Sequence, residues 1–312
     1  MRQPAGGAPQ RTDAEELLRL WRHQLLRAVA APGERGVSAV HSFAGQVALV
    51  TGGTRGLGRA VGIALARAGA HVVLTHRWGS VDEAELAAAF QQAGAAPPEV
   101  LEADAGSDAD TTELARTLAA RHGQVHIFVA NACVAARGRG LEGMRQRDLA
   151  NSLQTSSWPL QATLDALEQA CGRLPRVAVA MSSDGPDHYY PGYDYVAASK
   201  AALESLVRSL APRTAASGGR IFGLRTRQVG TQGLADMFGP ATSALLTQRL
   251  GHFGVDAAHI GQAVAMLATG LLDGLHGQTI TIDKGVGFVD NLIAVMPLLQ
   301  PAGAAPGPGV AA

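Results

Sequence analysis

The residues with the clearest chemical potential are a tyrosine and a lysine, Tyr193 and Lys200. A lysine ammonium can lower the pKa of a nearby tyrosine hydroxyl and can also bind a nucleotide ribose, provided that both side chains leave one face of a helix. Each helical residue advances about 100°, so the step between these two residues returns to within about 20° of the same direction. The pair can therefore serve a hydride-transfer site in which the tyrosine hydroxyl acts on the substrate.

The neighbouring Tyr195 does not pass the same test. On a helix its side chain would point about 140° away from that of Lys200. Val196 shares the lysine face but has no proton to give. We interpret Tyr195 as a packing residue.

The segment from Ser182 to Lys200, continuing into Ala201-Ala202-Leu203-Glu204, resembles the short-chain dehydrogenase/reductase family. The usual Tyr-x-x-x-Lys signature is absent, and the wider spacing is similar to the enoyl-thioester reductase branch, in particular enoyl-acyl-carrier-protein reductase III. The resemblance implies that Tyr193 and Lys200 are catalytic. It also implies that Ser182, in the Ser-x-x-Gly register ending at Gly185, binds the substrate carbonyl. Under this reading Ser183 caps the following turn, and the loop His188 to Tyr190 shapes the pocket. The alternative is a degenerate reductase that kept an aromatic residue near its lysine.

A second motif is an apolar strand, Val47 to Val50, followed by a glycine-rich turn and a helical stretch to Gly69. Glycines allow the backbone to approach a pyrophosphate, which then lies at the positive end of the helix. A purely structural turn is the alternative. The position after a strand and upstream of the Tyr/Lys pair favours a dinucleotide site formed by Gly52, Thr54, Arg55, Gly56, Leu57 and Gly58.

The second predicted strand ends in Thr75-His76-Arg77, where an NAD-preferring site usually has an acidic residue. The guanidinium groups of Arg55 and Arg77 favour the 2′-phosphate of NADPH. The sequence therefore predicts NADPH as the cofactor, with His76 and Arg77 among its contacts. The alternative is that Arg77 is only a solvated loop residue.

The family resemblance implies further cofactor contacts, from the adenine to the nicotinamide, at Asp104, Ala105, Asn131, Ala132, Lys200, Val229 and Thr231. The sequence departs from the family pattern at three places. Ala130 and Cys133 interrupt the usual Asn-Asn-Ala-Gly turn, and we interpret Cys133 as a small buried side chain. Gln154 occupies the position of a family asparagine whose role we do not transfer. The run from Arg225 to Gln228 replaces a Pro-Gly turn, and it either recognises a phosphopantetheine or carboxylate or is a solvated loop.

Apolar strands alternate with helical segments, which predicts an α/β fold: one Rossmann-type, doubly wound parallel sheet in a single domain over residues 43–290. The expected strands are Val47 to Val50, Val72 to Leu74, Val100 to Ala103, Val125 to Ala130, Arg176 to Met181, Ile221 to Leu224 and Thr279 to Ile282. Residues 1–42 form an extension in which Thr12-Asp13-Ala14-Glu15 opens an amphipathic helix, for packing or for docking another protein. Residues 291–312 form a second extension whose end, from Pro301, is expected to be disordered.

Composition limits the function classes. The formal net charge is zero, which does not favour a nucleic-acid surface or a polybasic membrane anchor. No apolar run reaches the roughly 20 residues that span a bilayer. The two cysteines suggest neither a disulfide framework nor a metal cluster, which favours a cytoplasmic location. Histidine spacing typical of a metal site is absent, so we predict no metal.

These patterns predict an NADPH-dependent reductase of an α,β-unsaturated acyl thioester or related enone, which an acyl carrier protein or coenzyme A can present. The alternatives are a ketoreductase of a secondary-metabolite intermediate, and a non-redox family member acting as a structural or partner subunit. The resemblance, together with the apolar segments Leu160 to Leu167 and Ala201 to Leu210, predicts a homodimer or homotetramer. The apolar segment Phe288 to Leu299 is expected near the pocket or a subunit boundary.

Overall fold

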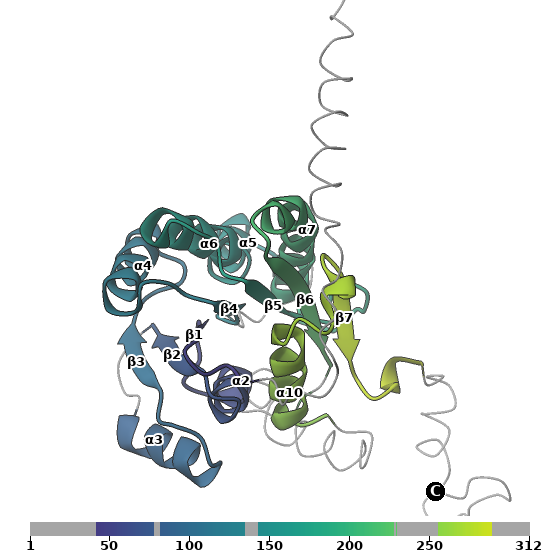
Figure 1. The fold of residues 1–312 in the computed structure, drawn as a ribbon. Helices are drawn as coiled ribbons and strands as arrows, with labels where there is room; N and C mark the ends of the chain where they lie inside the picture. Colours follow the sequence, from purple (N-terminus) through teal and green to yellow (C-terminus); the bar gives the residue numbers. More distant parts are fainter. Residues whose placement is uncertain (1–41, 78–81, 135–142, 228, 230–254, 289–312) are drawn as a thin grey trace, which may run out of the picture.

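A single parallel sheet organises the protein (Figure 1). The computed structural model describes residues 42–77, 82–134, 143–227, 229 and 255–288. Its strand order is β3-β2-β1-β4-β5-β6-β7, and every neighbouring pair is parallel. The strands are β1 (Val47–Val50), β2 (His71–His76), β3 (Glu99–Glu102), β4 (Ile127–Ala130), β5 (Val177–Ser183), β6 (Arg220–Thr226) and β7 (Thr279–Ile282). All seven predicted strands and the predicted fold class are confirmed.

Helices cover both faces of the sheet (Figure 1). One face carries α4 (Asp108–His122), α5 (Gln146–Ser156), α6 (Trp158–Cys171) and α7 (Asp194–Ala216). The other face carries α2 (Gly56–Arg67), α3 (Glu83–Gln92) and α10 (Ala257–Ala268). Two short 3₁₀ turns, η3 (Asp273–Leu275) and η4 (Val286–Phe288), lie before and after β7. Strand β1 shows why both faces are covered, because Ala48 and Val50 enter one apolar core while Val47 and Leu49 enter the other.

The strand order reverses at β1, which pairs with β2 on one side and β4 on the other. In an open sheet of this kind the ligand crevice lies at the carboxyl ends of the strands, at the reversal point. The residues after β1 and β4 are therefore the ones to examine for a ligand site.

Several predictions from the sequence lie outside the described residues. They are the amphipathic helix of the N-terminal extension, the C-terminal tail, Thr231, and all but the first residue of Phe288 to Leu299. The domain boundaries therefore stay predictions. Within the described ranges, every helix is too short or too polar to cross a lipid bilayer.

Helix α2, which begins beside the glycine-rich turn, packs closely against α10. A Cβ added at Gly261 would lie 2.5 Å from the backbone oxygen of Ala60. We predict that Gly261→Ala lowers the free energy of unfolding by about 1–3 kcal/mol, because backbone cannot yield as a flexible side chain can. Urea denaturation measures this loss. Gly274→Ala is the matched control, since an added Cβ there meets nothing within 4 Å. Equal stability of the two variants would contradict the close packing.

Candidate active site

The glycine-rich turn after β1 is held by Asn131, the first residue after β4. The Asn131 side-chain amide donates to the backbone oxygens of Thr51 at 3.0 Å and Gly52 at 2.9 Å. Gly52 has a φ of +61°, and a Cβ added at Gly58 would lie 2.6 Å from the Asn131 amide nitrogen. Glycine is thus required at both positions, by backbone conformation in one case and by space in the other. Asn131, predicted as a cofactor contact, fixes the turn on which the predicted pyrophosphate site depends.

The start of α2 has the properties of an anion site. Arg55 is its N-cap in extended conformation, no side chain caps the helix, and its first turn contains no acidic residue. The first N–H groups of a helix have no partner within the helix, so they can donate to an anion. A Cβ added at Gly56 would meet nothing within 4 Å, so this part of the turn is open. Thr54 and Leu57 are partly exposed beside it. These residues fit a pyrophosphate.

The predicted contacts for the adenosine end also come together, after β2 and β3. Arg77 Nε lies 3.1 Å from Asp104 Oδ2, and the other Asp104 oxygen accepts from the backbone N–H of Gly106 at 2.9 Å. The ring atom Nδ1 of His76 is buried and has no hydrogen-bond partner among the described residues. Buried polar atoms are normally paired, so this nitrogen fits a site completed by a ligand. Ala105 is partly exposed next to Asp104.

The Tyr193 and Lys200 side chains both meet the end of β5. Lys200 is buried, and its Nζ donates to the Met181 carbonyl oxygen at 2.7 Å. Tyr193 is the N-cap of α7, with φ −97° and ψ 3°, and its hydroxyl hydrogen-bonds with Ser183. A Cβ added at Gly185 would lie 2.7 Å from Tyr193 Cε1, so this glycine makes room for the ring. The tyrosine and the lysine are thus held against one strand end.

At the end of β5, Ser182 differs from the sequence interpretation. Ser183 caps the following turn as interpreted, because its Oγ accepts from the backbone N–H of Gly185 at 3.3 Å. Ser182 Oγ donates to Glu204 Oε1 at 2.7 Å, and both residues are buried. Successive residues of a strand point to opposite faces, so it is Ser183 that contacts Tyr193. The geometry therefore favours Ser183, interpreted from the sequence as a turn cap, as the second hydroxyl in place of Ser182.

Tyr195 packs as the helical argument predicts. It is 3% exposed, and its hydroxyl oxygen accepts from the backbone N–H of Arg145 at 2.7 Å. Tyr190 is the tyrosine that accompanies Tyr193, with the two rings edge to face at 5.9 Å. The Tyr190 hydroxyl donates to Asp184, a buried residue that the sequence interpretation missed. Tyr189, from the same loop, is 75% exposed.

Arg225, near the end of β6, and Arg227, just after that strand, are ion-paired within the protein. Arg225 makes two contacts of 2.6 Å with the Glu204 carboxylate and a further contact with Asp187. The Glu204 carboxylate accordingly raises the pKa of Arg225. Arg227 Nε lies 3.3 Å from Asp184 Oδ2. These acidic partners of Arg225 and Arg227 are separated from them by tens of residues, so local sequence could not show that the two charges are compensated.

The remaining predicted residues are placed as follows. Cys133 is exposed, so its interpretation as a buried side chain is wrong. Ser156 Oγ donates to its sulfur at 3.4 Å. The Gln154 amide donates to the backbone oxygen of Gly106 at 2.9 Å, beside the adenosine end of the site. Val229 is buried, and Ala132 is partly exposed next to Asn131.

Residues 52–287 match the family described as enoyl-(acyl carrier protein) reductase. The chain belongs to this family of short-chain dehydrogenases/reductases. It is an NAD(P)-dependent oxidoreductase, with one α/β reductase fold that includes both the glycine-rich turn and the Tyr/Lys pair.

Curated relatives of this reductase carry more than one activity in their names. It is 26% identical to 1-cyclohexenylcarbonyl-CoA reductase of Streptomyces collinus over 78% of this chain and 88% of the relative. This chain is also 24% identical to 3-oxoacyl-[acyl-carrier-protein] reductase of Staphylococcus aureus, over 77% of this chain and 97% of the relative.

Solved structures agree on the fold. A putative NAD(P)-dependent gluconate 5-dehydrogenase from Beutenbergia cavernae, with bound NADP at low occupancy, has a TM-score of 0.69 and 27% identity, over 80% of this chain and all of that one. A 3-oxoacyl-[acyl-carrier protein] reductase from Brucella melitensis in complex with NAD has a TM-score of 0.69 and 24% identity, over 78% of this chain and 98% of that one. This second likeness shows the fold alone.

The environment of Tyr193 keeps its hydroxyl protonated in the reductase without cofactor. Burial raises the pKa of Tyr193 to about 12, and the hydrogen bond with Ser183 opposes part of that rise. An unfolded tyrosine has a pKa near 10. The native state therefore prefers the protonated form, and the resulting stability is present below about pH 10 and is lost as the pH rises towards 12.

We predict that Tyr193 forms no phenolate below about pH 10.5 in the cofactor-free protein. The difference between the ultraviolet absorbance titrations of the wild type and Tyr193→Phe isolates this group. Circular dichroism over the same range verifies that both proteins stay folded. A phenolate removed by the substitution and titrating below pH 10 would contradict the burial argument.

Proposed function

We propose that this reductase uses NADPH to reduce an α,β-unsaturated acyl thioester or a related enone. The observation that carries the proposal is the placement of Tyr193, seven positions before Lys200, against the end of β5 beside Ser183. The nearer tyrosine, Tyr195, is buried with its hydroxyl on the Arg145 backbone. The hydroxyl available to a substrate is thus that of Tyr193, which is seven positions from Lys200, and not that of Tyr195.

The chain's own groups divide the chemistry between them. A bound nicotinamide would supply a hydride to the β-carbon of the substrate, and a proton from solvent at the α-carbon would complete the reduction. The Tyr193 hydroxyl, with Ser183 beside it, would donate to the substrate carbonyl oxygen and stabilise the negative charge that develops there. An ammonium has three N–H donors, so Lys200 can bind the nicotinamide ribose while it keeps its bond to Met181.

The preference for NADPH rests on charge at the adenosine end. Arg55 is exposed at the start of α2, and Arg77 follows β2, where many NAD sites have an acidic residue. The contact with Asp104 directs the Arg77 guanidinium through its Nε. The terminal nitrogens of the same group can then donate to a 2′-phosphate.

The relatives support two reactions. The Streptomyces collinus relative is named for reduction of a cyclohexenylcarbonyl-CoA, which favours enoyl reduction. The Staphylococcus aureus relative is named a 3-oxoacyl reductase, and it favours a ketoreductase as the second candidate. Its name also supports a substrate presented by an acyl carrier protein. We further propose a cytoplasmic homodimer or homotetramer. The 94% exposed Phe288 supports a contact with another subunit.

For the cofactor, we predict that Arg77→Ala weakens NADPH binding at least tenfold and leaves NADH binding within about twofold, because only NADPH carries the 2′-phosphate. Calorimetric titration of both nucleotides measures the two affinities. Arg59→Ala is the control, since this partly exposed arginine is the fourth residue of α2 and does not follow β2. Equal affinity of the wild type for the two nucleotides would refute the NADPH assignment.

For the chemistry, we predict that Tyr193→Phe lowers kcat for a crotonyl thioester by about 100-fold with NADPH binding retained, as for loss of a positioned proton donor. Tyr195→Phe is the matched control. It removes one hydrogen bond to the Arg145 backbone, so it should cost about 1 kcal/mol of stability and leave kcat nearly unchanged.

The same assay with an acetoacetyl thioester separates the two candidate reactions. The proposal requires the crotonyl thioester to have the higher kcat/KM. Loss of activity in Tyr195→Phe alone would contradict the assignment of Tyr193, and NADPH consumption with the keto substrate alone would favour the ketoreductase.

A further inference from the structure

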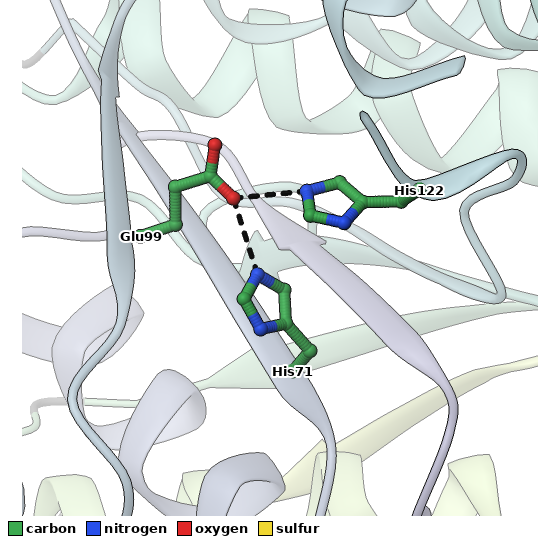
Figure 2. A group of neighbouring side chains, drawn as sticks. All are labelled: His71, Glu99 and His122. Atoms are coloured by element: carbon green, nitrogen blue, oxygen red, sulfur yellow. Dashed lines mark hydrogen bonds and ion pairs between the residues drawn. The ribbon is translucent and has the colours of Figure 1, made fainter. Parts of the chain in front are cut away.

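Two histidines and a glutamate meet at the amino ends of β2 and β3 (Figure 2). His71 is the first residue of β2, Glu99 is the first residue of β3, and His122 is the last residue of α4. The active-site residues follow the carboxyl ends of strands, whereas these strand residues stand at amino ends. The His71/Glu99/His122 cluster is therefore separate from the reductase chemistry.

The three side chains converge on one point. His71 Nε2 lies 3.1 Å and His122 Nε2 lies 2.9 Å from the same carboxylate oxygen, Oε2 of Glu99 (Figure 2). Their candidate ligand atoms all lie within 4.8 Å of one another. A tetrahedral zinc ion with bonds of about 2.0–2.1 Å holds its ligand atoms about 3.3 Å apart. The two nitrogens and the oxygen thus need only small side-chain movements to share one ion.

The surroundings orient these ligands. Arg121 pairs with the other oxygen of Glu99, Oε1, and so fixes the direction of the carboxylate. The side chains of Glu99 and His122 are 18% and 17% exposed, which limits their motion, whereas His71 is 49% exposed. Solvent can therefore reach the cluster from the His71 side and supply a further ligand.

We propose that His71, Glu99 and His122 bind one divalent transition-metal ion of the zinc type. Two imidazole nitrogens and one carboxylate oxygen favour such an ion, whereas magnesium and calcium prefer sites built from oxygen alone. The bound ion links β2, the edge strand β3 and helix α4, which gives it a stabilising role. Local spacing could not reveal the site, because His71 and His122 stand 28 and 23 residues from Glu99.

The test uses the full-length, tag-free protein after chelator treatment and dialysis. Titration with Co²⁺ should produce the visible absorption bands of a four-coordinate site, saturating at one ion per chain, and Zn²⁺ should displace it. His71→Ala should weaken Co²⁺ binding at least tenfold, and Glu99→Gln should also weaken it. His71 is half exposed, so its substitution should leave the fold intact.

His259→Ala is the matched control, because this exposed histidine at the start of α10 pairs with Asp256 instead. It should bind Co²⁺ like the wild type. Zn²⁺ should raise the thermal midpoint of the wild type and of His259→Ala but not that of His71→Ala. The proposal is overturned if the wild type shows no saturable binding, or if His71→Ala binds Co²⁺ as tightly as the wild type. In either case the residues form a hydrogen-bonded cluster only.

Discussion

The hydrogen bond from the Lys200 ammonium to the Met181 carbonyl oxygen determines how helix α7 sits against β5. A buried ammonium is costly unless it is hydrogen-bonded, so rotation of the helix that broke this contact would be strongly unfavourable. The contact therefore helps to hold the first turns of α7 against the end of β5. Tyr193 faces Ser183 at the strand end, and Tyr195 faces the backbone of Arg145.

The nucleotide half of the site also lies at the carboxyl ends of the strands. Strands β1 and β4 are neighbours, so Asn131 reaches the glycine-rich turn and holds it with two hydrogen bonds. At the end of β6, acidic partners compensate the partly buried Arg225 and Arg227. Glu204 accepts from both Ser182 and Arg225, which joins β5, β6 and α7 near the proposed catalytic residues. The site is thus built by contacts between the ends of parallel strands and by the helices that cover them.

The sequence predicted those features that depend on local pattern. Val47 to Val50 is apolar at every position because the strand is buried on both faces. Short apolar or alternating segments between helical stretches located the other strands, including the partly buried β3 and β7. Helical spacing correctly predicted that Tyr195 packs in the interior, whereas the catalytic role of Tyr193, the N-cap of α7, stays a prediction. The spacing could not decide between Ser182 and Ser183, because the face of β5 that meets Tyr193 depends on how α7 docks. The exposed Cys133, the Arg225–Glu204 pair and the His71/Glu99/His122 cluster depend on contacts between distant segments, and they needed the structure.

The most direct test of the account is a competition between two thioesters. Equal amounts of crotonyl and acetoacetyl thioester are incubated with the protein and with NADPH that carries deuterium at both C4 positions, and the products are followed by NMR. The account predicts a butyryl thioester with deuterium on its β-carbon, and loss of this product in Tyr193→Phe. Deuterium found only at the carbinol carbon of a 3-hydroxybutyryl thioester would contradict it.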